Sequence, residues 1–227
     1  MIGRLEFVSG GRSWGEVGEL YGLSILRMQV DPEGRFGVYR LRRAGRRLCR
    51  GGVLRTLLPE AFEGWELLRE LGLKGVDPSP LLRAAAPELT LEALQQRDLD
   101  PKAATVALSG QRVDGEMLRC ATALCARVRR VVVDADGGER LALRLREEFG
   151  LPVLPMEHPA QLELCFSPGK TGHRAPRLEL FGRKPDLDGL KLVAPGLAQE
   201  DRCALDVMTL LWERGKLPYN GIKINRN

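Results

Sequence analysis

The sequence predicts an α/β protein in which a small antiparallel β-module precedes a mostly parallel, three-layer sheet. Three observations predict this class. Strand and helix patterns alternate after residue 52, which is typical of a parallel sheet covered by helices. Short segments separated by turn residues fill residues 1–52, which is typical of antiparallel strands. Of the 227 residues, 44% are hydrophobic, enough to bury a core. We therefore expect two domains, residues 1–52 and 53–227.

The N-terminal segments alternate between polar and apolar residues, which predicts strands. Ser13 is placed to cap a short helix between the first two of them, with Glu16 three residues further on. Asp31–Gly34 and Ala44–Gly45 are turn sequences, so the chain is expected to fold back at both. The predicted strands are residues 4–8, 24–30, 35–41 and 46–50.

From residue 53 the apolar pattern changes between the strand and helix periods. The predicted strands are residues 53–58, 105–108, 131–134, 151–154, 162–166, 177–181, 190–193 and 222–224. The predicted helices are residues 62–73, 81–86, 90–99, 114–128, 138–149 and 199–214. Gly150 follows the helix at 138–149 and is a natural terminator for it.

Residues 105–136 carry the clearest structural signal in the chain. Thr105–Leu108 is a buried strand pattern, a helix pattern follows from Asp114, and Val131–Val133 is a second buried strand that ends at Asp134. Strand, helix and strand within about thirty residues predict one right-handed βαβ unit.

The turn after Leu108 is the first candidate site, because ligands of an open parallel sheet bind at the carboxyl ends of its strands. It reads Gly110-Gln111-Arg112-Val113-Asp114-Gly115 and matches the first and third glycines of G-x-G-x-x-G. Arg112 stands where the second glycine would let a pyrophosphate approach the backbone. Asp134 stands where a carboxylate would accept the ribose 2′-hydroxyl.

In this topology and in two of the three glycines, residues 105–136 resemble the first βαβ unit of Rossmann-type NAD(P)-binding proteins. The resemblance implies a Rossmann-like domain, NAD(P) as the cofactor it would take, and a cofactor site at Gly110, Arg112, Gly115 and Asp134. Three interpretations stay open. The domain has lost or altered nucleotide binding, or Arg112 contacts a phosphate at the helix N-terminus, or the glycines only pack a strand against a helix.

An arginine-rich segment at residues 35–50 is the second candidate site, with Phe36 and Tyr39 interleaved. As a two-stranded basic ribbon it would bind nucleic acid, because arginines contact phosphates and aromatic rings stack on bases. The alternative is a solvated face that protects a sheet edge. The net charge of +5 permits a polyanionic partner without requiring one. The candidate nucleic-acid residues are Arg40, Arg42, Arg43, Arg46 and Arg47.

Several chemistries find no support in the sequence. The five cysteines are scattered without CxxC spacing, which predicts reduced, buried thiols, and Cys165 is expected in the core. The two histidines, His158 and His173, lie in loop sequence and predict no metal centre or catalytic triad. The Gly-Lys-Thr triplet at 169–171 lacks the first glycine and the helix of a P-loop.

Two acidic stretches are expected to be structural. Asp186–Gly189 lacks the later ligands of a calcium loop, so we expect a turn there. Asp136 precedes two glycines and is expected to cap the helix at 138–149 rather than hold a magnesium ion. No catalytic residue is predicted.

The function predicted first is a non-catalytic or ligand-sensing Rossmann-like module with a degenerate nucleotide or phosphate cleft. Its partner would be a small phosphate-bearing ligand or another protein. The alternative is an NAD(P)-dependent oxidoreductase with a divergent glycine loop, and a further alternative is nucleic-acid binding through the basic ribbon. No apolar run approaches the ~18 residues of a membrane span and no signal peptide is recognised, so we expect a cytoplasmic protein without a membrane partner.

Overall fold

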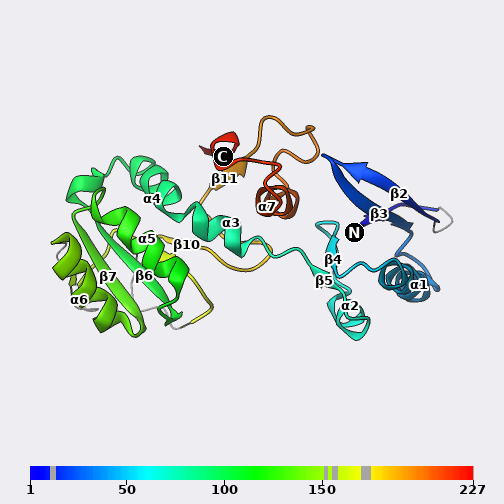
Figure 1. Ribbon diagram of the computed structural model, residues 1–227, viewed down its shortest axis with the longest axis horizontal. Coiled ribbons are helices and arrows are strands. Elements are labelled where there is room, and N and C mark those ends of the chain that lie inside the picture. The colour runs from blue at the N-terminus through cyan, green and yellow to red at the C-terminus, as the bar shows by residue number, and fades with distance from the viewer. Residues whose placement is uncertain (11–13, 151–152, 155–157, 170–174, 227) are drawn as a thin grey trace. The chain divides into compact units, whose positions relative to one another are not determined.

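The structure, a computed structural model, describes residues 1–10, 14–150, 153–154, 158–169 and 175–226 (Figure 1). The chain forms two compact units: Met1–Val76 with Thr209–Pro218, called unit 1, and Asp77–Met208 with Tyr219–Asn227, called unit 2. The α/β class predicted from the sequence is confirmed, with parallel strand pairs in both units. The boundary expected between residues 52 and 53 falls inside unit 1.

Unit 1 contains a five-stranded sheet in the order β2-β3-β1-β4-β5. Only β2 and β3 pair in the antiparallel sense; β1 pairs in parallel with β3 and β4, and β4 with β5. Tyr21 and Gly22, both with positive φ, form the two-residue turn of the β2–β3 hairpin. The strands are β1 (Ile2–Phe7), β2 (Trp14–Leu20), β3 (Leu23–Val30), β4 (Arg55–Leu57) and β5 (Lys74–Gly75).

Helix α1 (Gly37–Arg50) occupies the segment for which two antiparallel strands were predicted. That prediction was wrong because β3 and β4 run parallel on either side of β1, and parallel strands need a crossover between them. The helix buries Ala44, Gly45 and Leu48, which lie at helical rather than strand spacing. Gly45 is therefore not a turn residue: a Cβ there would collide with Leu71 Cδ1.

The short helix expected at residues 13–20 is also absent from the described part of this segment. Trp14–Leu20 forms β2, while Ser13 lies outside the described residues. A hairpin with β3 satisfies the backbone of β2, so tertiary pairing overrides the local capping signal. The core beneath the sheet includes Met28, Leu48 and Phe62, and unit 1 also holds α2 (Trp65–Glu70).

Unit 2 contains a parallel five-stranded sheet in the order β10-β9-β6-β7-β8. When these strands are numbered 1 to 5 along the chain and the sheet is read from β8 to β10, the order is 3-2-1-4-5, which is the Rossmann order. The predicted βαβ unit is confirmed, with α5 (Gly115–Cys125) between the first two strands. The strands are β6 (Thr105–Arg112), β7 (Arg130–Asp136), β8 (Val153–Leu154), β9 (Leu162–Cys165) and β10 (Arg177–Glu179).

Helix α6 (Gly138–Phe149) connects β7 to β8 and ends as predicted at Gly150, whose φ is 64°. Its start differs from the prediction. The N-cap residue is Gly137, with φ of 83° and no side-chain cap, so Asp136 belongs to β7 instead of capping the helix. Helix α5 buries Met117, Cys120, Ala121 and Leu124, which supply its side of the core.

The remaining elements complete the two units. Before β6, unit 2 contains α3 (Ser79–Ala84), α4 (Ala86–Gln95) and the short helix η1 (Pro101–Ala103). A two-stranded antiparallel sheet joins β11 (Leu190–Val193) to β12 (Lys223–Arg226), with α7 (Leu205–Glu213) and η2 (Tyr219–Gly221) between them in the chain. Among the described residues, no helix is both long enough and apolar enough to cross a membrane.

Candidate functional site

The point where the winding of the unit 2 sheet reverses lies between β6 and β9. In folds of this order a ligand binds at the carboxyl ends of the strands beside that point. Here the two strand ends are joined directly, since Phe166 N–H donates to Ser109 O at 2.8 Å and Gln111 N–H donates to Ser167 Oγ at 2.8 Å. The predicted site residues therefore lie at the expected edge of the sheet, but that edge is occupied by protein groups.

The expected glycine loop is largely strand. Strand β6 continues through Gly110 and Gln111 to Arg112, which pairs in register with Asp136 of β7 after a register shift beyond Ser109. Only Val113 and Asp114 remain to connect β6 to α5, and Val113 N–H donates to Asp136 O at 2.9 Å. Because the connection is this short, no open loop is present to wrap a pyrophosphate.

The space beside Gly110 is filled. A Cβ built there would lie 3.1 Å from Met117 Cε, 3.4 Å from Ser167 Oγ and 3.5 Å from Phe166 Cβ. Met117 comes from the first turns of α5 and is fully buried. The first glycine of the motif thus allows close packing of a strand against a helix, which was one of the three interpretations left open by the sequence.

The N-terminus of α5 is capped by Asp114. Its Oδ1 accepts hydrogen bonds from the backbone N–H groups of Glu116 at 3.0 Å and Met117 at 2.8 Å. A carboxylate in this position satisfies donors and matches the positive end of the helix dipole, as a bound phosphate would. Gly115, the third glycine of the motif, is the first residue of α5 and is exposed.

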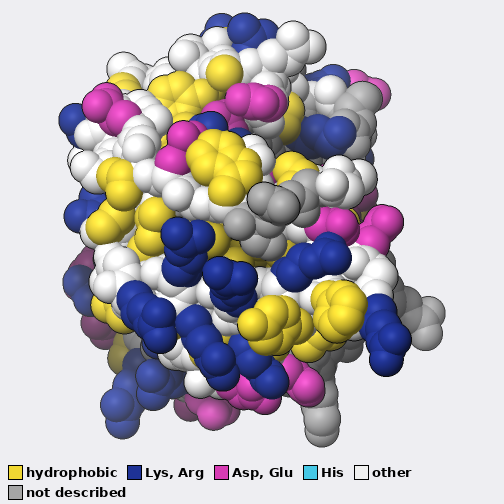
Figure 2. All heavy atoms as spheres, turned by 90° about the vertical axis from the view of Figure 1, so that its right-hand side faces the viewer, with side chains coloured by type: hydrophobic (Ala, Val, Ile, Leu, Met, Phe, Trp, Pro, Cys, Tyr) yellow, Lys and Arg dark blue, Asp and Glu magenta, His cyan; other side chains and the backbone are white. Residues whose placement is uncertain are grey.

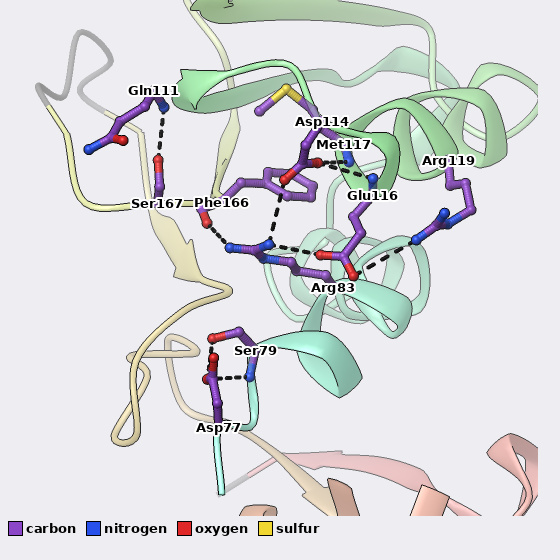
Figure 3. Close-up of polar contacts among 10 residues, drawn as sticks. All are labelled: Asp77, Ser79, Arg83, Gln111, Asp114, Glu116, Met117, Arg119, Phe166 and Ser167. Atoms are coloured by element: carbon purple, nitrogen blue, oxygen red, sulfur yellow. Dashed lines mark hydrogen bonds and ion pairs between the residues drawn. The ribbon is translucent and has the colours of Figure 1, made fainter. Parts of the chain in front are cut away.

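Arg83 of α3 connects this cap to the end of β9 (Figure 3). Its Nη1 lies 2.8 Å from Glu116 Oε2 and 3.5 Å from Asp114 Oδ2, and its Nη2 donates to Phe166 O at 2.6 Å. Arg119 is mostly exposed and lies further away, at 3.8 Å from Glu116 Oε1. One guanidinium therefore holds two carboxylates and a strand end together.

The sequence did not single out Arg83, Ser167 or the role of Asp114 as a cap within the site. Arg83 stands alone among apolar residues in Leu81-Leu82-Arg83-Ala84, which is the one local sign that it has a buried partner. Its contacts are with residues 33 and 83 positions away, so no local pattern could identify them.

The other predicted cofactor residues are less closely associated. Arg112 is exposed, and no acidic side chain in the described residues forms an ion pair with it. Asp134 is half-buried in β7 and paired in register with Ser109. Among the described residues, no hydrogen bond or ion pair connects Asp134 to Gly110, Arg112 or Gly115.

Next to this edge, a polar group of side chains surrounds Cys165, which is buried as predicted. Its Sγ accepts from Ser109 Oγ at 3.4 Å and from Arg177 Nη2 at 3.3 Å, and Arg177 Nε lies 3.5 Å from the fully buried carboxylate of Glu163. Burial raises the pKa of the Cys165 thiol, although the hydrogen bonds from Ser109 and Arg177 act in the opposite direction. The group is therefore read as core structure.

The structure also locates some of the residues that the sequence analysis considered for metal binding and for loops. No set of three or more potential metal ligands gathers among the residues that the structure describes. Asp186–Gly189 forms a turn, in which Asp188 N–H donates to Asp186 Oδ1 at 2.9 Å. His158 is exposed, while His173 and part of the Gly-Lys-Thr triplet lie outside the described residues.

The predicted nucleic-acid residues are brought together on α1 of unit 1, not on a β-ribbon. Arg42, Arg43, Arg46 and Arg47 line one side of the helix, with Tyr39 and Arg50. Arg40 lies apart from them and pairs with Asp31 at 2.8 Å. Asp31 also accepts hydrogen bonds from the backbone N–H groups of Glu33 and Gly10.

No family model and no curated protein matches the chain. Solved structures give low similarity. L-tryptophan dehydrogenase from Nostoc punctiforme matches with a TM-score of 0.33 and 13% identity, covering 63% of this chain and 44% of that one. The Leu-bound form of hetero-hexameric glutamate dehydrogenase from Thermus thermophilus matches with a TM-score of 0.25 and 17% identity, covering 72% and 53%.

The chain thus spans about half the length of these two dehydrogenases. Neither likeness carries an argument about activity. The Rossmann-like description of unit 2 rests on its strand order and parallel pairing.

Proposed function

We propose that the protein is a non-catalytic, ligand-responsive module that binds a small phosphate-bearing ligand at the ends of β6 and α5. The observation that carries this proposal is the arrangement at the α5 N-terminus, where the Asp114 carboxylate occupies the place of an anion and is paired with Arg83. A phosphate would compete with this carboxylate for the same helix donors.

Arg112 supplies the cationic partner that the competing phosphate needs. It is exposed, two residues before the cap, and forms no ion pair with a described acidic residue. Arg83 supplies the response. When a ligand displaces Asp114, the Arg83–Asp114 contact at 3.5 Å breaks, while the contact to Glu116 at 2.8 Å keeps the arginine in place. Ligand binding would thereby change the connection of α3 to α5.

The described side chains at these strand ends support the non-catalytic part of the proposal. The described polar residues there include Arg83, Ser109, Gln111, Arg112, Asp114, Glu116, Asp134, Asp136, Glu163, Cys165, Ser167 and Arg177. They offer no lysine, histidine or tyrosine as a proton donor near neutral pH. Cys165 is buried, and desolvation raises the pKa of its thiol, which disfavours the thiolate.

An NAD(P)-dependent oxidoreductase is the alternative function for the same site. It would require Met117, Phe166 and Ser167 to move away from Gly110 before a pyrophosphate could approach the backbone. Arg112 would then favour the additional phosphate of NADP over NAD. Five unpaired cysteines agree with the reducing, cytoplasmic setting that we propose for either function.

Thermal unfolding with inorganic phosphate, NAD, NADP, ATP and GTP tests the proposal, with sodium chloride at equal ionic strength as the reference. A ligand at about 100 times its Kd adds roughly 2.7 kcal/mol, a rise of several degrees. Arg112→Gln should remove the shift, and Arg129→Gln, an exposed arginine of the same unit, should leave it unchanged.

Asp114→Asn distinguishes competition from simple capping. Asparagine caps a helix as well as aspartate does but carries no charge, so it removes the competing anion. We expect this variant to bind phosphate ligands more tightly than the wild type. Flat curves for both proteins with every ligand would refute the phosphate site, and a shift confined to NADP would favour the oxidoreductase.

A further inference from the structure

The outward side of α1 in unit 1 forms a continuous arginine face. A hollow of about 310 Å³ lies among its side chains, near the lower limit of roughly 300 Å³ for ligand pockets. Figure 2 shows Lys and Arg side chains gathered in a band over this helix, with hydrophobic side chains beside them. The residues that line the hollow are Tyr39, Arg42, Arg43, Arg46, Arg47 and Arg50.

The charge of this face is hardly neutralised within the protein. Helix α1 contains no acidic residue. Arg42 pairs with the exposed Glu70 at 3.1 Å, but no acidic side chain among the described residues lies within 4.0 Å of Arg43, Arg46, Arg47 or Arg50. Like charges four residues apart, such as Arg43 and Arg47, repel each other and weaken the helix.

The helix forms in spite of this repulsion, because burial of its opposite side stabilises α1. Ala44, Gly45 and Leu48 are buried, and Cys49 Sγ donates to Leu71 O at 3.0 Å. The arginines therefore add a strong positive potential without contributing to the core. A polyanion that neutralises several of them at once is the partner that this arrangement suits.

The residue types favour nucleic acid over a lipid surface. A helix that lies in a membrane inserts an apolar side, but Ala44, Gly45 and Leu48 of α1 are already buried in unit 1, and the exposed apolar residues of the helix are only Val38 and Tyr39. All the cations are arginines, whose planar guanidinium binds phosphate through two hydrogen bonds and stacks on bases. Tyr39, 63% exposed, lies at one end of the row and Phe36, 60% exposed, precedes the helix.

We propose that α1 binds the phosphate backbone of single-stranded nucleic acid, with a base stacked on Tyr39. From Tyr39 to Arg50 the helix rises about 16 Å, the length of about five nucleotides in a stacked strand. Because α1 lies against its own sheet, it presents a surface for a strand to follow. Arginines on phosphates and an aromatic ring on a base face contact groups that every nucleotide has, so binding is expected to depend little on sequence.

Fluorescence anisotropy with a labelled 20-nucleotide RNA of mixed sequence tests this proposal in the full-length protein. If four arginines each neutralise a phosphate, affinity should fall about fiftyfold between 50 and 200 mM salt. Replacing Arg43, Arg46, Arg47 and Arg50 together by Gln should abolish binding at 100 mM salt. Tyr39→Ala should weaken it about fivefold or more, and Tyr39→Phe should retain it.

A matched control removes the same charge from other exposed positions: Arg129, Arg140, Arg146 and Arg214, each changed to Gln. Circular dichroism and the unfolding midpoint verify that both quadruple variants are folded. Retained binding by the α1 variant, or equal loss in the control, would overturn the proposal. So would binding to the matched duplex alone or to phosphatidylserine vesicles alone. Because Arg112 lies in unit 2, a failed phosphate site there leaves this result unaffected.

Discussion

Arg83 Nη2 donates a hydrogen bond of 2.6 Å to the carbonyl oxygen of Phe166, which lies 83 residues further along the chain. The bond fixes α3 against the end of β9, beside the point where the unit 2 sheet reverses its winding. The same guanidinium pairs with Glu116, in the first turn of α5. Thus a residue outside the βαβ unit connects α3 and α5 to the strand end beside that reversal.

Replacing Arg83 by Met should destabilise the protein by about 1.5–3 kcal/mol. The change removes the cation beside Asp114 and the nearer of the two cations beside Glu116, and it leaves the carbonyl oxygen of Phe166 without its donor. Arg83→Lys should recover only part of this loss, since an ammonium group cannot reproduce the fork geometry. Urea unfolding measures the change in stability of both variants. Arg119→Met, which removes a mostly exposed contact at 3.8 Å, is the control and should change stability by less than about 0.5 kcal/mol.

Loss of the α5 cap should lower the free energy of unfolding even when no ligand is present. Asp114→Ala removes the acceptor for two backbone N–H groups and should cost about 0.5–2 kcal/mol, whereas Asp114→Asn retains the cap. Denaturant midpoints of the two variants and the wild type give the comparison. Equal loss in both variants would mean that the charge of Asp114, and not its hydrogen bonds, stabilises the helix end.

Gly37, at the start of α1, should tolerate no side chain. A Cβ there would collide with the backbone oxygen of Pro32, which cannot move aside as the end of a side chain can. Gly37→Ala is therefore expected to destabilise unit 1 by about 1–3 kcal/mol. Gly18→Ala in β2 is the matched control, because no atom of the described residues lies within 4 Å of its Cβ position. Thermal unfolding that ranks the two variants equally would contradict the packing of the start of α1 against Pro32.

Protonation of the Asp31 carboxylate in acid should lower the stability of the folded protein. The backbone N–H of Glu33 donates to its carboxylate and, with the charge of Arg40, lowers its pKa below the usual 3.8 despite an opposing effect of burial. A lowered folded-state pKa gives a contribution that is complete above about 3.8 and is lost as pH falls through the lowered value. Midpoints measured from pH 5 to pH 2 should decline less for Asp31→Asn than for the wild type.

The thiols should differ in reactivity according to burial. Cys203 is exposed and should react first with iodoacetamide at pH 8. Cys120 is buried, and desolvation together with the charge of Glu88 raises its pKa to about 12, so it should react only when the protein unfolds. Peptide mass spectrometry of labelled protein, with and without urea, reports both rates. Rapid native labelling of Cys120 would contradict the packing of α5.

The sequence predicted the βαβ unit correctly because its signals are local. An apolar run predicts β6, a helical period predicts α5, and a second apolar run predicts β7, each within one window of residues. The extent of β6 was not predictable in the same way. Gly110 and Arg112 read as loop, yet pairing of Arg112 with Asp136 extends the strand. Pairing depends on a second strand, and the sequence of the first contains no information about it.

Helix α1 shows even more clearly that the sequence of one segment does not reveal its tertiary contacts. Its arginine-rich sequence also fits the alternation of a strand, and Ala44–Gly45 fits a turn. The position of the segment between the parallel strands β3 and β4 requires a crossover, and burial of Ala44, Gly45 and Leu48 selects the helix. The sequence by itself determined that the arginines and aromatics are close in the chain. Tertiary structure decided that five of the arginines share one side of a helix with Tyr39.

For the candidate site, the sequence by itself determined the α/β class and the βαβ unit, and it predicted a strand edge as the candidate site. Only the tertiary structure decided that Asp114 caps α5, that Arg83 holds this cap, and that Met117 fills the space beside Gly110. The physical reason is the range of the interactions. Helix and strand periods are set by neighbouring residues, whereas ion pairs and close packing join groups that only the folded chain brings within a few ångströms.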